Sequence, residues 1–244
     1  MRFANQQLTT TGIVLTLALA AAPVTAQEVA LVARSAEPMD AATAKALEAV
    51  RAATAKYQDV EIALAEGYLR DPANLCALPA EEGLPVQLGA MGIHFFRPDL
   101  LQITAMEPRV DGTGIHTDFT QPSVLIYVPD ETGALELGAV ENLVFEKAWK
   151  AAGNSGPPEF QGRQYWHRID NPATPDVDEA HMFEPHYELH VWLYEDNPSG
   201  MFSPYNPAAS CDAHDGPKTM AEAVEYMKAH APRAAEPATA AEQS

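Results

Sequence analysis

The amino-acid sequence predicts an α+β protein: a mostly antiparallel sheet, or a small β-barrel, with one long N-terminal helix packed on it. Two observations predict this class. Residues 40–68 repeat apolar side chains at three- and four-residue steps, which is the pattern of one helical face. After Pro72 the chain consists of short apolar runs separated by Pro, Gly, Asn and Asp, which is typical of strands joined by turns.

The helix is expected to begin at Asp40, a good N-cap residue, and to extend to Tyr68 without an internal proline. A second, short helix is expected over residues 217–230. The connections at 97–121 and 150–185 are long, and long loops in compact domains are often functional. The four expected strands are residues 90–96, 123–128, 135–145, with a break at Gly138 left open, and 187–194.

Composition limits the possible partners. The chain of 244 residues carries 34 acidic and 15 basic side chains, for a formal net charge of −19. Nucleic acid is therefore excluded as a partner, because phosphate binding needs a Lys/Arg surface that is missing here. An anionic membrane surface is disfavoured for the same reason. The remaining partners are a small-molecule ligand or a metal ion.

The N-terminus has the order of a secretory signal peptide over residues 1–26, with Arg2, an apolar run at 12–22 and small residues up to Ala26. We therefore expect an exported protein, periplasmic or secreted. No later segment approaches 18 apolar residues, so no membrane span is expected in the mature chain. The expected organisation is a flexible segment at 27–38, a single domain at 39–230 and a disordered Ala/Pro/Glu tail at 231–244.

Two cysteines, Cys76 and Cys211, are far apart in the sequence. In an oxidising compartment such an even pair favours a disulfide over free thiols, and no Cys-x-x-Cys spacing indicates a metal site. The sequence therefore predicts a bridge that closes a long loop.

The segment around residues 186–194 alternates two kinds of side chain. His186, Glu188 and His190 step by two and project from one face of a strand, and Trp192 and Tyr194 are expected to continue that face. The other face is purely apolar. A face that mixes imidazole, carboxylate and aromatic groups is typical of a pocket lining.

Two further polar residues occur inside apolar strands. His94 follows Gly92, which would leave room beside the imidazole for a ligand or for close backbone approach, and Glu141 is costly to bury unless it is paired, hydrogen-bonded or metal-bound. With His190 they match a 2-His-1-carboxylate centre for a divalent ion, with Fe, Mn, Zn and Cu not distinguished. Spacing leaves a structural alternative open, in which each His bonds to backbone and Glu141 pairs with Arg or His.

These residues give three hypotheses. The first is a metal-dependent periplasmic enzyme, with His186 or Glu188 as catalytic candidates and Phe96, Trp192 and Tyr194 around an apolar pocket. The second is a non-catalytic protein that binds a metal or a small ligand, and the third is an exported domain without a metal. Whether the chain is an enzyme at all is left open.

Several segments together resemble a family of exported bacterial proteins of unassigned function. The resemblance covers roughly residues 54–211, and the segments that carry it are Met-Gly-Ile-His at 91–94, Ala-Val-Glu at 139–141, His-Val-Trp-Leu-Tyr at 190–194, Asp-Asn-Pro-Ser-Gly-Met-Phe at 196–202 and Asn-Pro-Ala-Ala-Ser-Cys at 206–211. It implies the Cys76–Cys211 bridge and the set His94, Glu141 and His190, but no reaction. The chain departs from the pattern at 102–121 and 178–186, which leaves open whether three further histidines join the site: His116, His181 and His214.

Overall fold

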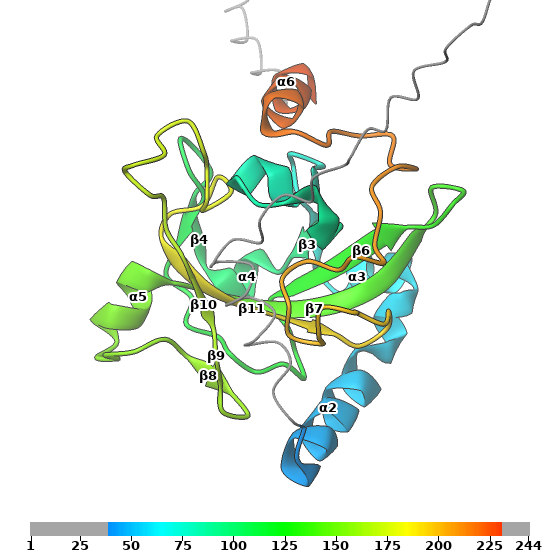
Figure 1. Cartoon of the computed structure of the whole chain (residues 1–244). Coiled ribbons are helices and arrows are strands. Elements are labelled where there is room, and N and C mark those ends of the chain that lie inside the picture. The colour runs from blue at the N-terminus through cyan, green and yellow to red at the C-terminus, as the bar shows by residue number, and fades with distance from the viewer. Residues whose placement is uncertain (1–38, 231–244) are drawn as a thin grey trace, which may run out of the picture.

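The computed structural model of the protein describes residues 39–230 (Figure 1). The expected signal peptide, the segment 27–38 and the tail 231–244 lie outside the described residues.

The centre of the fold is a seven-stranded sheet in which every pairing is antiparallel. Its order is β1-β3-β6-β7-β11-β10, and β2 also pairs with β3. No barrel closes within residues 39–230, so the α+β class with a mostly antiparallel sheet is confirmed in its open form. The strands of this sheet are β1 (Leu69–Arg70), β2 (Cys76–Ala77), β3 (Gly92–Phe96), β6 (Val124–Pro129), β7 (Leu135–Phe145), β10 (Trp166–Arg168) and β11 (His186–Trp192).

Two small two-stranded sheets and several short helices fill the long connections. The small sheets pair β4 (Ile103–Ala105) with β5 (Asp111–Gly112) and β8 (Glu159–Phe160) with β9 (Arg163–Gln164). The short helices are η2 (Pro79–Glu82), η3 (Val86–Leu88), α4 (Pro98–Leu101) and α5 (Glu146–Ala151), and α6 (Met220–His230) ends the described chain.

The expected single long N-terminal helix is not confirmed. Helix α2 (Ala41–Thr54) begins where predicted, with Asp40 accepting a 2.7 Å hydrogen bond from the Thr43 backbone N–H. A 3-10 turn η1 (Ala55–Gln58) and a second helix α3 (Val60–Ala65) follow. Asp59 caps α3 by accepting from the Glu61 N–H, so an aspartate between two apolar positions of the predicted helix starts a new helix instead of continuing the first.

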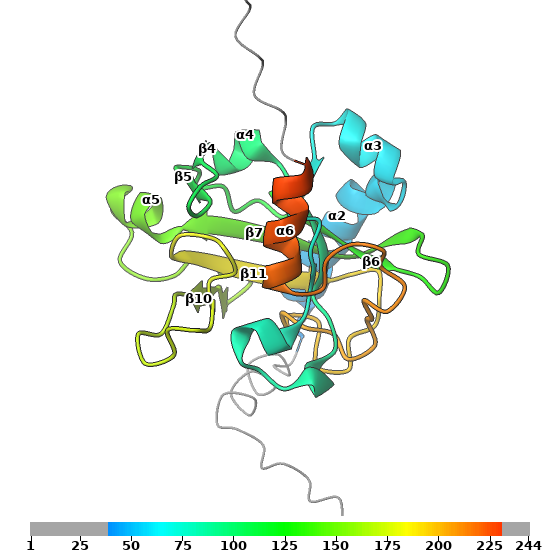
Figure 2. The ribbon, with the colours of Figure 1, turned by 90° about the horizontal axis from the view of Figure 1, so that it is seen from above.

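One face of the sheet packs against these helices. The Tyr127 hydroxyl donates a 2.6 Å hydrogen bond to the Tyr57 carbonyl, and the rings of Phe95 and Tyr127 lie 4.7 Å apart. Figure 2 shows α2 and α3 together on one side of the strands. Apart from the buried amide of Asn142, the residues of β3, β6, β7 and β11 on this face are apolar and belong to the core.

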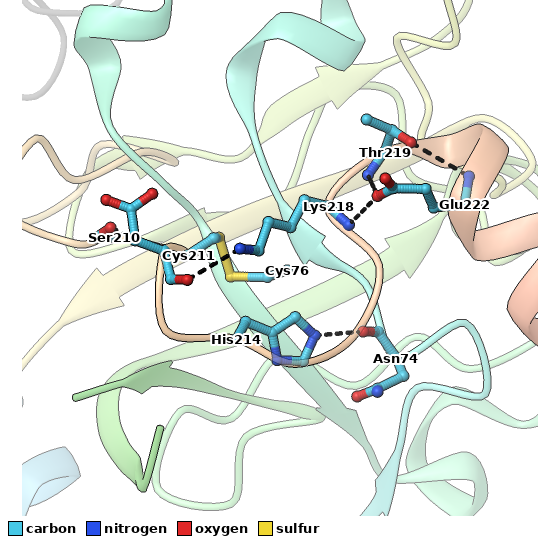
Figure 3. Close-up of a disulfide and its surroundings, with 9 residues drawn as sticks. Asn74, Cys76, Ser210, Cys211, His214, Lys218, Thr219 and Glu222 are labelled. Atoms are coloured by element: carbon cyan, nitrogen blue, oxygen red, sulfur yellow. Dashed lines mark hydrogen bonds between the residues drawn. A yellow bond between two sulfur atoms is a disulfide. The ribbon is translucent and has the colours of Figure 1, made fainter. Parts of the chain in front are cut away.

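The opposite face carries the polar strand residues and is covered by irregular chain. The loop after β11 folds back on the sheet, since the Trp192 indole donates to the Ser203 carbonyl at 2.7 Å and Ala90 forms an isolated bridge with Asn206. The predicted Cys76–Cys211 disulfide is confirmed, and it ties this loop to β2 (Figure 3).

None of the helices within residues 39–230 combines the length and the apolar character needed to cross a bilayer.

Candidate metal centre

Strand register brings three polar side chains to the covered face. His190 of β11 lies directly opposite Glu141 of β7, and on the other side of β7 Glu141 lies opposite Val124 of β6. Val124 in turn lies opposite Phe96, two residues from His94 on β3. Because side chains on neighbouring strands that lie opposite share a face, and so do residues two apart, all three polar groups point to one side.

The three groups converge. The Nε2 atom of His190 is 3.4 Å from Oε2 of Glu141, and the Nε2 atom of His94 is 3.6 Å from the same oxygen. One donor atom from each residue lies within 4.8 Å of the other two. Ligands about 2.0–2.2 Å from a tetrahedral ion are about 3.3–3.6 Å apart, so these spacings suit a shared cation with little rearrangement.

Two of the three residues, His190 and Glu141, carry buried atoms without a hydrogen-bond partner in the described chain. Within residues 39–230, neither ring nitrogen of His190 makes a hydrogen bond, and neither does Oε2 of Glu141. His190 is fully buried and Glu141 is 1% exposed. A buried polar group without a hydrogen bond costs about 1–3 kcal/mol, so three such atoms together are a substantial penalty. A cation bound by Nε2 of His190 and Oε2 of Glu141 would satisfy two of them.

Burial also sets the protonation of the cluster. It lowers the pKa of His94 to about 3 and that of His190 to about 4, so both imidazoles are neutral, which is the form that binds metals. The pKa of Glu141 is raised well above its usual range, mainly by burial and next by the negative charge of Glu188. A cation between the three groups would supply the positive charge that the ionised form of Glu141 needs in this buried place.

Gly92 explains how β3 and β6 come so close beside His94. Its φ is +102°, and a Cβ there would lie 2.7 Å from the Tyr127 carbonyl oxygen. The room that Gly92 leaves beside His94, predicted for either a ligand or close backbone approach, is therefore filled by the backbone of β6.

A second group of potential ligands, His181, His186 and Glu188, lies beside the first and has a different character. Arg168 donates to Glu82 at 2.5 Å, and its Nε lies 2.9 Å from Oε1 of Glu188. His181 places Nδ1 2.7 Å from Glu82 and Nε2 3.3 Å from Glu188. Both carboxylates thus already have cationic partners.

The charges in this second group balance without a metal. Despite the opposing effect of burial, Glu82 and then Glu188 raise the pKa of His181 to about 10, so His181 is an imidazolium whose two N–H groups face carboxylates. An imidazolium has no lone pair to offer a metal. We therefore describe this group as a buried ion-pair network and the His94–Glu141–His190 group as the candidate metal centre.

The two catalytic candidates fall in or next to this network. Glu188 faces the cavity beside the candidate centre, but it is held by Arg168 and by His181. His186 is fully buried, with its Nδ1 bonded to the Glu184 carbonyl at 3.0 Å, and it does not line that cavity.

The cavity at the candidate centre has a volume of about 30 Å³. That is room for about two water molecules or small ligand atoms next to an ion. His94 and Glu141 contribute to its wall, and so do Glu188 and His181.

Of the expected pocket residues, only Phe96 lines this cavity. Trp192 instead faces the loop after β11, where its indole is bonded to Ser203. Strand β11 ends at Trp192, so the strand alternation does not extend to Tyr194, whose hydroxyl bonds to Thr54 at 2.8 Å and to the Arg51 carbonyl at 3.0 Å on α2.

Of the three further histidines, one lies at the cavity and two lie elsewhere. His181 lines the cavity, whereas His116 is bonded to the Asp118 and Gln121 carbonyls. His214 lies beside the disulfide, with its Nε2 2.8 Å from the Asn74 carbonyl oxygen (Figure 3).

Sequence reasoning missed Glu82 and Arg168, since both lie in segments without a strong strand pattern. The adjacent aromatic residues Tyr165 and Trp166 were the available signal for β10, since aromatic residues are enriched in strands. Two successive positive φ angles, 37° at His181 and 70° at Met182, were not detectable in the sequence. Such angles are uncommon outside glycine and concentrate at functional sites.

The fold and the site together define an α+β protein with a three-donor candidate metal centre on the covered face of an open antiparallel sheet. No protein-family model matches the chain, and neither a curated protein nor a solved structure matches it significantly. Support for a function therefore comes from the site itself.

Proposed function

We propose that this protein is an exported metal-dependent enzyme whose divalent ion is held by His94, Glu141 and His190. The observation that carries the proposal is that three buried atoms, both ring nitrogens of His190 and Oε2 of Glu141, have no hydrogen-bond partner within residues 39–230. In the adjacent network both carboxylates are hydrogen-bonded, Glu82 to Arg168 and Tyr205 and Glu188 to His181 and His186. The 2.9 Å contact between Arg168 Nε and Glu188 Oε1 is an ion pair without hydrogen-bond geometry.

The number of donors supports catalysis over storage. Within the described part of the chain, the group contains three donors and no fourth His, Cys, Asp or Glu. Structural metal sites are closed by four protein ligands, whereas catalytic sites keep positions open for water or substrate. His186, which could have closed the site, is engaged elsewhere.

The chain's own residues would position and polarise the bound molecule. A metal ion at this site would supply a Lewis acid or redox centre with open positions. Phe96 stacks parallel to the His94 imidazole at 5.8 Å and fixes the orientation of that ring. The imidazolium of His181 places a positive charge on the wall of the cavity, and its two N–H groups are held by Glu82 and Glu188.

Export is part of the proposal. It is supported by the signal-peptide pattern of residues 1–26, by the resemblance to exported bacterial proteins, and by a disulfide of the kind that persists in oxidising compartments.

The proposal is tested by metal analysis of the mature protein purified from the periplasm. We expect about one transition-metal ion per chain, and a loss of affinity of more than about 100-fold in His190→Ala and in Glu141→Gln, since even indirect partners of a metal contribute 10- to 100-fold. His116→Ala is the matched control, because it removes an exposed imidazole outside the site. Equal metal content in all four proteins, or none after titration with Zn²⁺, would contradict the ligand assignment.

A further inference from the structure

A second, apolar pocket adjoins the cavity of the candidate centre. It has a volume of about 180 Å³, and its wall is almost entirely apolar. Its apolar wall includes Leu69, Phe96, Ile103, Met106, Val110 and Phe183.

The pocket and the inner cavity share walls. Phe96 and Phe183 line both, with ring centroids 5.5 Å apart, and Asp71 also borders both. Phe96 is the residue stacked on the His94 imidazole. A molecule that contacts Phe96 from the pocket would therefore lie about one aromatic ring away from a proposed metal ligand.

The mouth of the pocket is open to solvent and unusually apolar. Leu69 is 56% exposed and Met106 is 48% exposed, and both are pocket residues. Phe183, which lines both the pocket and the inner cavity, follows directly after the two positive-φ residues His181 and Met182. The strained turn therefore sets the position of the Phe183 ring. Aromatic walls, an apolar mouth and local strain beside a reactive centre are the features of a substrate site.

The volume limits what fits. An engineered apolar cavity of about 150 Å³ binds benzene, so a pocket of this size suits a group of about six to eight carbon atoms. Asp71 is half-buried and lines both the pocket and the inner cavity, and its Oδ1 already accepts a 2.9 Å bond from the Ala73 N–H.

We propose that this pocket binds the apolar part of the substrate, a single aromatic ring or a branched alkyl group, and presents the inner end of the molecule to the His94–Glu141–His190 centre. The presentation of the substrate to a metal rests on the proposed function. The binding of a small aromatic molecule in the pocket is independent of that function.

The test uses 4-fluorotoluene as the probe and ¹⁹F NMR on the full mature chain. We expect saturable binding to the metal-free protein and, since the inner donors do not line the pocket, an affinity within about twofold in His190→Ala. Leu69→Asp should weaken binding at least about tenfold, because it places a charge at the apolar mouth. Leu64→Asp is the matched control, since Leu64 is a 40% exposed leucine on α3 outside the pocket.

Ile103→Trp fills the pocket instead of charging it and should also abolish binding. Absence of saturable binding in the wild type, or equal weakening by Leu69→Asp and Leu64→Asp, would overturn the pocket. Circular dichroism of each variant separates loss of the pocket from loss of the fold.

Loading the protein with paramagnetic Mn²⁺ tests presentation separately. The ¹⁹F relaxation of the bound probe should be enhanced several-fold in the wild type and not in His190→Ala. Bound probe without enhancement in a Mn²⁺-loaded protein would overturn the presentation step. If Mn²⁺ does not bind, Cu²⁺ takes its place, since it is also paramagnetic and N/O sites bind it more tightly. Failure of both ions to bind would overturn the metal centre and the presentation step, and the probe affinities would still decide whether the pocket takes an aromatic ring.

Discussion

Replacement of Glu141 by methionine should stabilise the metal-free protein. Oε2 of Glu141 is buried without a hydrogen bond, and its contacts with His94 and His190, at 3.6 and 3.4 Å, do not have hydrogen-bond geometry. Exchange of an unsatisfied polar group for an apolar group of similar size removes a penalty of about 1–3 kcal/mol. For a domain of this size the melting temperature should rise by about 2–12 °C.

The same substitution should remove stabilisation by metal. A ligand at 100 times its dissociation constant stabilises the folded state by about 2.7 kcal/mol, which corresponds to about 5–11 °C in this protein. Wild type should gain this on addition of Zn²⁺, whereas Glu141→Met should gain almost nothing. Without metal, Glu141→Met should therefore melt above the wild type. With Zn²⁺ the difference between the two melting temperatures should shrink or change sign.

Differential scanning calorimetry after chelator treatment, and again with Zn²⁺, measures both effects. Leu143→Met is the control for methionine itself, because Leu143 lies two residues further along the same face of β7 and lines the same cavity. A metal-free Glu141→Met protein that melts below the wild type would refute the reasoning, since it would mean that Glu141 contributes structural bonds.

Two further predictions concern the frame around the site. The Cys76–Cys211 bridge closes a separation of 135 residues, so the double variant Cys76→Ala/Cys211→Ala should lose about 5 kcal/mol of unfolding free energy in urea titrations; a loss below about 1 kcal/mol would contradict the chain-entropy account. The pKa of His181 is raised from 6.5 to about 10, so the native state binds the extra proton, and its contribution to stability is complete below about pH 6.5 and lost as the pH rises through about 10. Urea unfolding between pH 7 and 9 should show stability falling in the wild type and in a His116→Gln control, and falling less in His181→Gln; an equal slope in all three would show that His181 is not the group responsible.

Local patterns in the sequence predicted the regular elements well. The first helix begins at Asp40, and the strands around His94, Glu141 and His190 occur where alternation and apolar runs placed them. The expected continuous helix is interrupted at Asp59, because an aspartate between two apolar positions of a helical stripe can cap a new helix as well as continue an existing one. The end of β11 at Trp192 was equally hidden, and with it the orientation of Tyr194.

The relation between the polar groups depends on pairing between distant segments. Alternation alone put His186, Glu188 and His190 on one face of a strand. It could not tell that His190 would meet Glu141 while Glu188 would meet Arg168 from β10. Because of that difference Glu188 has a cationic partner, whereas the ring nitrogens of His190 have no hydrogen bond within residues 39–230.

The sequence by itself determined the acidic composition, the even cysteine pair, the apolar faces of the strands and the three polar residues set among them, because each of these is a property of composition or of short-range periodicity. Only the tertiary structure decided that the polar residues converge on Oε2 of Glu141, that an arginine neutralises their neighbours, and that an apolar pocket opens beside them. The physical reason is that cavity walls and charge balance arise from strands and loops far apart in the chain, and their register is set by packing of the whole sheet.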